Sequence, residues 1–316
     1  MADTEHFVRD DVRAFLNLLE QANRPGVEEL PVEEGRQGMA ALNLLAEAPP
    51  RDLAVIENLS CPGPDGDIPL RLYDTREERE AGPVVLFIHG GGFVIGDLDI
   101  YHSICTEICA QLDLPVVSVD YRRAPEAPFP AAPDDCEAAA RWVASGPDAL
   151  GRKVTGLIPM GDSAGGNLTI VTTNALCSEP AEVPVICQVP IYPVADDVSQ
   201  YESFRQFSDG YFLTGASMAF FTQQYAADPS DPRNLPLLGD CSNTPPTIIC
   251  TAGLDPLRDS GRAYAGHIIS RGADVTYLEF KGTIHGFINL RKGIPSAQKD
   301  VEALLGAVKN MLERSA

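Results

Sequence analysis

The sequence predicts an α/β fold in which a mostly parallel sheet is flanked by helices. After two strand-like runs at 54–59 and 68–73, strand-like apolar runs alternate with helical patterns, an order typical of parallel sheets. Two glycine-rich turns, at 89–93 and 161–165, each follow an apolar run directly. Of the 316 residues, 44% are hydrophobic, which is enough for a sizeable buried core.

The elements follow from the periodicity of the apolar residues. The region up to about Glu47 is helical in pattern, because Val12, Phe15, Leu16 and Leu19 fall on one face, and Pro49-Pro50 ends it. A further helix is expected at 164–177. Strands are expected at 54–59, 68–73, 84–88, 116–121, 157–160, 185–192, 247–251 and 275–280.

The first glycine-rich turn is His89-Gly90-Gly91-Gly92-Phe93. Such a triplet could be a flexible loop or a phosphate cradle. A phosphate loop would also carry the lysine and hydroxyl of G-x-x-x-x-G-K-[ST], which are absent here. We therefore expect the backbone N–H groups of Gly91 and Gly92, together with that of Ala164, to stabilise a negatively charged oxygen during acyl transfer.

The second turn, Gly161-Asp162-Ser163-Ala164-Gly165, has the pattern G-x-S-x-G. It lies between a strand-like and a helix-like segment, so the serine is expected on a sharp elbow with its hydroxyl exposed. The pattern also occurs by chance, and the alternative is an ordinary turn with an incidental serine. Asp162 is expected to point away from the site as a local hydrogen-bond acceptor.

A serine nucleophile needs a base, and the base needs an acid that orients it. Asp255 comes just after the strand-like run at 247–251, and His285 just after the run at 275–280. Both therefore belong to the sheet edge at which open α/β folds bind ligands. Asp259 is the rival acid, but it is expected to pair with Arg258 or to cap the next helix.

His285 is the expected base among five histidines, since it alone is a loop residue in the last third of the chain. His89 is expected to orient the glycine loop or to reach the substrate side. Structural roles are expected for the remaining three, His6, His102 and His267.

Taken together, these segments resemble the microbial esterase branch of the hormone-sensitive lipase family of α/β-hydrolases. The resemblance covers nearly the whole chain and rests on H-G-G-G-F at 89–93, D-Y-R-R-A-P-E at 120–126, G-D-S-A-G-G at 161–166, D-P-L-R-D at 255–259 and H-G-F at 285–287. Arg123 departs from the family pattern, which more often has leucine there. The resemblance implies an eight-stranded, mostly parallel sheet with a helical cap, and a structural turn at 120–126.

The same resemblance implies a catalytic triad of Ser163, His285 and Asp255 and the hydrolysis of short- to medium-chain carboxylic esters, with no metal or organic cofactor. Hormone receptors similar to this family lack the full triad, and the presence of His285 distinguishes this chain from such binding proteins. Amides, carbamates and lactones remain open as alternative acyl donors. Because similar enzymes form dimers through the last strand, a homodimer is expected.

An aromatic-rich segment at 193–225 interrupts the alternation of strands and helices. We expect residues 1–48 and 193–225 to form the cap, and 49–192 with 226–316 to form the catalytic core. Phe93, Tyr192 and Phe212 are candidates for lining an acyl pocket.

The charge balance limits the possible partners. With 24 basic and 45 acidic residues the formal charge is −21, which disfavours nucleic acid and anionic membranes. Eight scattered cysteines are expected to be buried, reduced thiols. The beginning, Met1 to Glu5, has neither the basic nor the apolar region of a signal peptide, and no run approaches the ~20 apolar residues of a membrane span. A cytoplasmic protein that acts on a small-molecule ester is expected.

Overall fold

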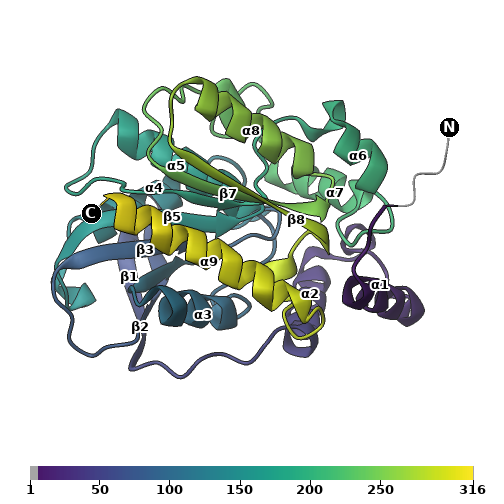
Figure 1. The fold of residues 1–316 in the computed structure, drawn as a ribbon, viewed down its shortest axis with the longest axis horizontal. Coiled ribbons are helices and arrows are strands. Elements are labelled where there is room, and N and C mark those ends of the chain that lie inside the picture. The colour runs from purple at the N-terminus through teal and green to yellow at the C-terminus, as the bar shows by residue number, and fades with distance from the viewer. Residues whose placement is uncertain (1–5, 316) are drawn as a thin grey trace.

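An eight-stranded sheet forms the centre of the molecule, and helices cover both of its faces (Figure 1). The computed structural model describes residues 6–315, so the predicted absence of a signal peptide at Met1–Glu5 concerns residues outside that range. The strand order is β1-β2-β4-β3-β5-β6-β7-β8. The strands are β1 (Val55–Gly63), β2 (Gly66–Asp74), β3 (Gly82–Ile88), β4 (Val116–Val119), β5 (Val154–Asp162), β6 (Val189–Ile191), β7 (Thr247–Leu254) and β8 (Val275–Ile284).

The pairing agrees with the predicted, mostly parallel sheet. Only the pairs β1–β2 and β2–β4 are antiparallel, and all pairs from β4 to β8 are parallel. The carboxyl ends of β3, β5, β7 and β8 therefore meet at one edge. The two glycine-rich turns and the loops carrying Asp255 and His285 all begin at this edge.

Helices pack on both faces because the central strands are apolar on both sides. In β3, Val84, Leu86 and Ile88 face one core cluster, whereas Val85 and Phe87 face the other. The helices are α1 (Asp10–Ala22), α2 (Val32–Ala46), α3 (His102–Leu112), α4 (Ala131–Ala144), α5 (Ala164–Ser178), α6 (Glu202–Phe207), α7 (Gly215–Tyr225), α8 (Arg258–Ser270) and α9 (Ser296–Ser315). Helices α3 and α9 lie together on one face, and α4 and α5 lie together on the other.

The predicted strand at 185–192 is the clearest difference between sequence and structure. Only Val189–Ile191 forms β6, while Val185 and Gln188 make isolated bridges to neighbouring strands. Pro184 and Pro190 flank or interrupt the run, and a proline has no N–H to give to a ladder. The apolar composition is therefore that of a buried strand, but the continuous pairing is short.

Helices α1, α2, α6 and α7 gather at one end of the molecule, on the right in Figure 1. Short 3₁₀ turns at Val27–Glu29 (η1) and Val198–Gln200 (η3) belong to the same two segments, and η1 contacts α7. The rings of Phe15 in α1 and Phe212 lie 6.3 Å apart. These helices thus come from the two sequence regions expected to form the cap.

Two sets of contacts fasten this helical group to the core. Arg36 of α2 donates to the carbonyls of Val94 and Ala124 and to the carboxylate of Glu126, at 2.7–3.2 Å. The ion pair lowers the pKa of Glu126 to about 2. At the beginning of α1, the N–H of Arg9 donates to the carbonyl of Gly282 in β8 at 3.1 Å, and its guanidinium donates to the carbonyl of Lys281 at 2.9 Å.

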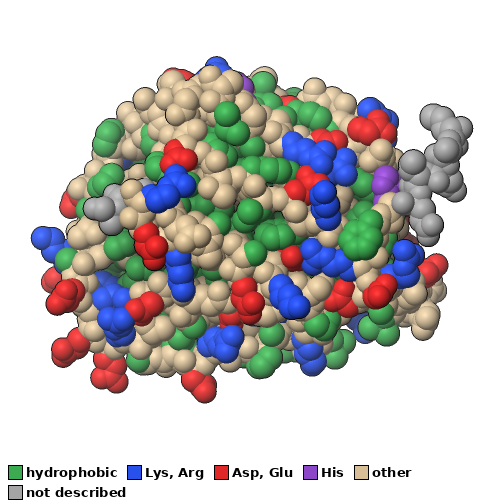
Figure 2. Space-filling view, in the orientation of Figure 1, with side chains coloured by type: hydrophobic (Ala, Val, Ile, Leu, Met, Phe, Trp, Pro, Cys, Tyr) green, Lys and Arg blue, Asp and Glu red, His purple; other side chains and the backbone are tan. Residues whose placement is uncertain are grey.

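The surface charge is dispersed on the face that carries α9. Figure 2 shows acidic and basic side chains interspersed there among apolar ones, so the excess negative charge does not form a single acidic patch on this face. Among residues 6–315, no helix has the length and apolar character needed to cross a membrane. All eight cysteines are free, and seven of them are buried, as expected.

Candidate active site

The elbow predicted around Ser163 is present at the junction of β5 and α5. Ser163 has φ 55° and ψ −117°, a strained conformation for a residue with a side chain. Glycine is required on both sides, because a Cβ on Gly161 or Gly165 would lie 2.3 or 2.0 Å from the carbonyl oxygen of Ile88. This close packing against β3 is what allows the turn to be so sharp.

Three side chains that are distant in the sequence meet at this elbow. The Oγ of Ser163 lies 2.8 Å from Nε2 of His285, and Nδ1 of His285 lies 2.7 Å from Oδ2 of Asp255. Asp255 is fully buried and His285 is 7% exposed, whereas Ser163 remains partly accessible. Because an ionised carboxylate only accepts hydrogen bonds, the ring proton lies on Nδ1, and Nε2 is free to accept the proton of the serine hydroxyl.

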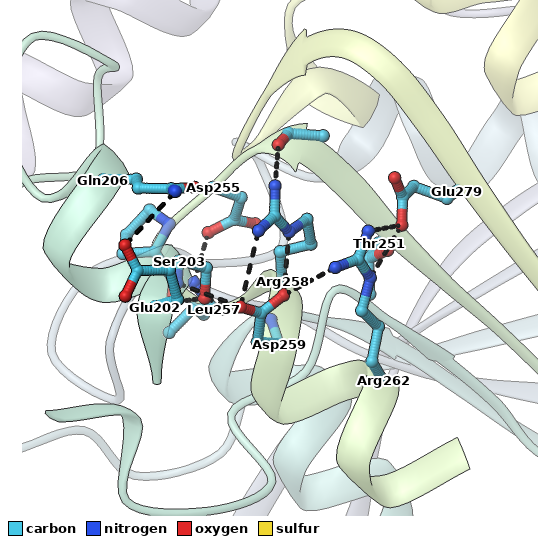
Figure 3. Close-up of polar contacts among 12 residues, drawn as sticks. Glu202, Ser203, Gln206, Thr251, Asp255, Leu257, Arg258, Asp259, Arg262 and Glu279 are labelled. Carbon is cyan, nitrogen blue, oxygen red and sulfur yellow. Dashed lines mark hydrogen bonds and ion pairs between the residues drawn. The ribbon is translucent and has the colours of Figure 1, made fainter. Parts of the chain in front are cut away.

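The two rival acids have different partners (Figure 3). The second oxygen of Asp255 accepts the N–H of Leu257 at 2.8 Å, so both oxygens of this carboxylate are engaged. Asp259 instead pairs with Arg258 and Arg262 at 2.9 Å, as expected for a structural acid. These partners lower the pKa of Asp259. The geometry therefore places Asp255, and not Asp259, beside the imidazole.

The glycine loop after β3 lies next to the elbow. Gly91 and Gly92 have φ values of +105° and +61°, which favour glycine, and both are partly accessible. Ala164 is the first residue of α5, where backbone N–H groups have no acceptor within the helix. Gly91 and Gly92 follow Gly90, whose N–H donates to Asp162, and Ala164 directly follows Ser163, so the three expected oxyanion donors belong to segments that meet at the elbow.

Two polar residues near the site have partners that the sequence did not reveal. Asp162 is an acceptor, but for distant groups: the N–H of Gly90 and the hydroxyls of Tyr101 and Tyr192. His89 is fully buried and stacks on Tyr121 with ring centroids 4.2 Å apart, so it does not reach the substrate side. Burial lowers the pKa of His89 to about 4.

The three aromatic residues expected to line a pocket occupy different environments. Phe93 is buried, and its ring stacks on that of Tyr225 with the centroids 3.8 Å apart. Tyr192 has no exposed surface. Phe212 is half-buried, and its ring would contact a Cβ on Gly286, next to His285, at 3.3 Å. Phe221 was not predicted. It is half-buried on α7, and its ring covers the α-carbon of Gly92 so closely that a Cβ there would lie 2.3 Å away.

Residues 85–289 match a family model described as the alpha/beta hydrolase fold. This match covers well over half of the chain. The chain belongs to the alpha/beta hydrolase family. Within the family it lies in the branch of esterases that resemble hormone-sensitive lipase.

Curated relatives of this hydrolase are similar over nearly its full length. An ethyl acetate hydrolase of Pseudomonas putida is 34% identical over 96% of this chain and 98% of its own. A carboxylic ester hydrolase, LipN, of Mycobacterium tuberculosis is 35% identical over 92% of this chain and 80% of its own. An ester hydrolase from the metagenome of Lake Arreo, solved with a derivative of bipyridine phosphonate, superposes with a TM-score of 0.89 at 35% identity, covering 97% of this chain and 99% of that one.

Proposed function

We propose that this carboxylic ester hydrolase is a serine carboxylesterase (EC 3.1.1.1) that cleaves short- to medium-chain acyl esters. The observation that carries the proposal is the continuous hydrogen-bonded chain from Ser163 Oγ through His285 to Asp255, with contacts of 2.8 and 2.7 Å. A nucleophile, a base and an orienting acid in this order are the requirements of acyl transfer.

The steps follow from the positions of the atoms. Ser163 attacks the ester carbonyl while Nε2 of His285 accepts its proton, and the negative oxygen forms against the N–H groups of Gly91, Gly92 and Ala164. His285 then protonates the leaving alkoxide. Water, deprotonated by the same nitrogen, attacks the acyl-enzyme, and Ser163 leaves with the returned proton. Asp255 keeps the imidazole in the required tautomer and stabilises its cationic form.

The two half-buried phenylalanines support a limit on substrate size. The leaving alkoxide has to lie near Nε2 of His285 to be protonated, so Phe212, beside Gly286, would border the alcohol. Phe221, above Gly92 on the oxyanion side, would border the acyl chain. Two aromatic walls close to the reacting carbon suit small esters. The Pseudomonas putida relative, an ethyl acetate hydrolase, points the same way.

Residues 1–48 and 193–225 form the cap in this proposal, over a core of 49–192 and 226–316. Support comes from the grouping of α1, α2, α6 and α7 at one end of the molecule and from the placing of Phe212 and Phe221 against catalytic loops. A homodimer and a cytoplasmic location complete the proposal. Size-exclusion chromatography with light scattering and cell fractionation are the respective tests.

Phe221→Ala is expected to extend the acyl range. Removing the ring opens space beside Gly92, and each accommodated methylene can contribute about 10-fold or more to specificity. The ratio of kcat/KM for p-nitrophenyl octanoate to that for the acetate should therefore rise about 10-fold or more. Phe212→Ala is the matched control, because it should change the preference for the alcohol and leave the acyl ratio unaltered. An acyl ratio that is the same in Phe221→Ala and the wild type would refute this assignment of the walls.

The serine chemistry has a direct test. A fluorophosphonate should label folded wild-type protein at a single residue, Ser163, as identified by peptide mass spectrometry. Failure to label would favour a binding protein on the same scaffold over an esterase. Parallel assays on matched ester and amide analogues would then separate ester hydrolysis from the alternative acyl donors.

A further inference from the structure

A buried carboxylate lies directly behind the elbow, and the catalytic steps above do not use it. Asp162 is 2% exposed and precedes the nucleophile. Its hydrogen-bond donors in the described structure are all uncharged: the N–H of Gly90 to Oδ1 at 2.8 Å, and the hydroxyls of Tyr101 and Tyr192 to Oδ2 at 3.2 and 3.3 Å. A buried carboxylate without a basic partner lowers the stability of a fold, so a functional reason for this residue is worth seeking.

The first of these contacts holds the oxyanion loop. Gly90 comes directly before the expected donors Gly91 and Gly92, and its N–H points at Asp162. The approach is so close that a Cβ on Gly90 would lie 2.7 Å from Oδ2 of Asp162 and 2.9 Å from the hydroxyl of Tyr101. Because Asp162 is also bonded covalently to Ser163, the carboxylate fixes the distance between the loop and the nucleophile.

The third contact reaches the base. Tyr192 follows β6 with a strained φ of 34°, and its ring lies against that of His285 with centroids 4.6 Å apart. Burial raises the pKa of both Tyr101 and Tyr192, so these phenols stay protonated and donate to the carboxylate. The bond from Tyr192 to Asp162 therefore fixes the surface on which the imidazole rests.

The charge of Asp162 also acts on the base. Burial raises the pKa of Asp162 to about 6, so the group is an anion above that pH, and a protonated His285 attracts it. The other titratable groups around Asp162 are phenols and thiols whose pKa burial raises, and they remain neutral in this range: Tyr101, Tyr121, Tyr192, Cys105 and Cys250. Asp162 does not hydrogen-bond to the imidazole in the described structure; the carboxylate that does so is Asp255.

We propose that Asp162 is a positioning residue for acyl transfer: its carboxylate fixes the oxyanion loop through Gly90 and supports the imidazole of His285 through Tyr192. The inference rests on the proposed function. Asp162 would be a second anion near His285, in addition to Asp255. Through its hydrogen bonds and its position in the chain it would also connect the oxyanion loop, Ser163 and Tyr192, on which the imidazole rests. Such preorganisation raises kcat more than it affects substrate binding.

The experiment compares Asp162→Ala, Asp162→Asn and Tyr192→Phe by kcat and KM on p-nitrophenyl acetate from pH 5 to 9. Asp162→Ala frees the loop and should lower kcat about 100-fold, with KM changed by less than about threefold. Asp162→Asn keeps an oxygen for Gly90 but no charge. It should lower kcat about 10-fold and move the acid limb of kcat/KM to lower pH, because the cationic imidazole loses an attracting anion. Tyr192→Phe should lower kcat about 3- to 10-fold.

Tyr264→Phe is the matched control. Tyr264 is equally buried but its hydroxyl accepts from Gln188, in a different cluster, so kcat should stay within about twofold of the wild type. This control separates the loss of any buried phenol from the loss of the one that contacts Asp162.

Thermal unfolding distinguishes this role from a merely structural one. If Asp162 only stabilised the fold, Asp162→Asn would have a lower Tm than the wild type, whereas the proposed role predicts a higher Tm at pH 8. Because the folded-state pKa of Asp162 is raised above its unfolded value of 3.8, the wild type loses stability as the pH rises from about 4 through about 6. Asp162→Asn lacks this loss, so its Tm should exceed that of the wild type at pH 8, and the difference should vanish near pH 4.

Wild-type kcat in both Asp162 variants would overturn the proposal, as would a fall in kcat that parallels a lowered Tm at pH 8. If Asp162→Ala does not fold, Asp162→Asn and Tyr192→Phe decide by the same criteria. The outcome is separable from the function itself, since fluorophosphonate labelling of wild-type Ser163 tests the esterase independently.

Discussion

Ser163→Ala should lower kcat for any ester substrate by at least about 10⁴-fold while the fold stays intact. The substitution removes Oγ, the atom proposed to attack the ester, which lies 2.8 Å from Nε2 of His285. The elbow itself does not depend on this hydroxyl, because its sharpness comes from Gly161 and Gly165 against Ile88. The residual rate would come from the oxyanion donors and substrate binding.

The measurement is steady-state hydrolysis of p-nitrophenyl acetate, with circular dichroism as the check on folding. Ser118→Ala, at a buried serine of β4, is the control and should retain turnover. Near-wild-type turnover in Ser163→Ala would remove this residue from the mechanism, whatever the geometry of its neighbours.

Asp255→Asn should lower kcat by about 10⁴-fold with little change in Tm. The N–H of Leu257 donates to Oδ1, so that position has to remain an oxygen in the variant. The amide nitrogen then faces Nδ1 of His285 and donates to it. This forces the ring proton onto Nε2, which can no longer accept the proton of Ser163. The side chain keeps its shape, but the base is held in the wrong tautomer.

Asp259→Asn is the control for this prediction, because Asp259 lies four residues away and pairs with Arg258 and Arg262. It should retain turnover within about tenfold, and any loss should accompany a lower Tm. If Asp259→Asn proved the more damaging of the two in kcat, the assignment of the orienting acid would be wrong.

Much of the fold was predictable because its signals are local. The β-branched apolar run Val84–Ile88 favours a buried strand, and the loops that follow parallel strands meet at one sheet edge. Chain order then placed Ser163, Asp255 and His285 at this edge, and the structure brings the three within hydrogen-bond distance. The glycines at 161 and 165 could be recognised from the sequence because the tight turn of the G-x-S-x-G pattern leaves no space for a side chain at these positions.

Contacts between segments that are distant in the sequence could not be predicted, because no periodic pattern of residues indicates them. Nothing around Asp162 indicates that its partners are Gly90, Tyr101 and Tyr192. The aromatic residues of 193–225 are equally apolar in sequence, so only the packing of α7 distinguishes Phe221, which faces Gly92, from its neighbours. For the same reason the composition around Tyr192 could not tell a pocket wall from a residue buried behind the imidazole.

The attachment of Arg9 to Lys281 and Gly282 has a practical consequence for work on this enzyme. The anchoring residues lie three and four positions before His285, so Arg9 steadies the segment that carries the proposed base. A truncation that removes Arg9 should therefore lower turnover, although it changes no residue of the proposed triad. Preparations that differ in whether they retain Arg9 are not directly comparable.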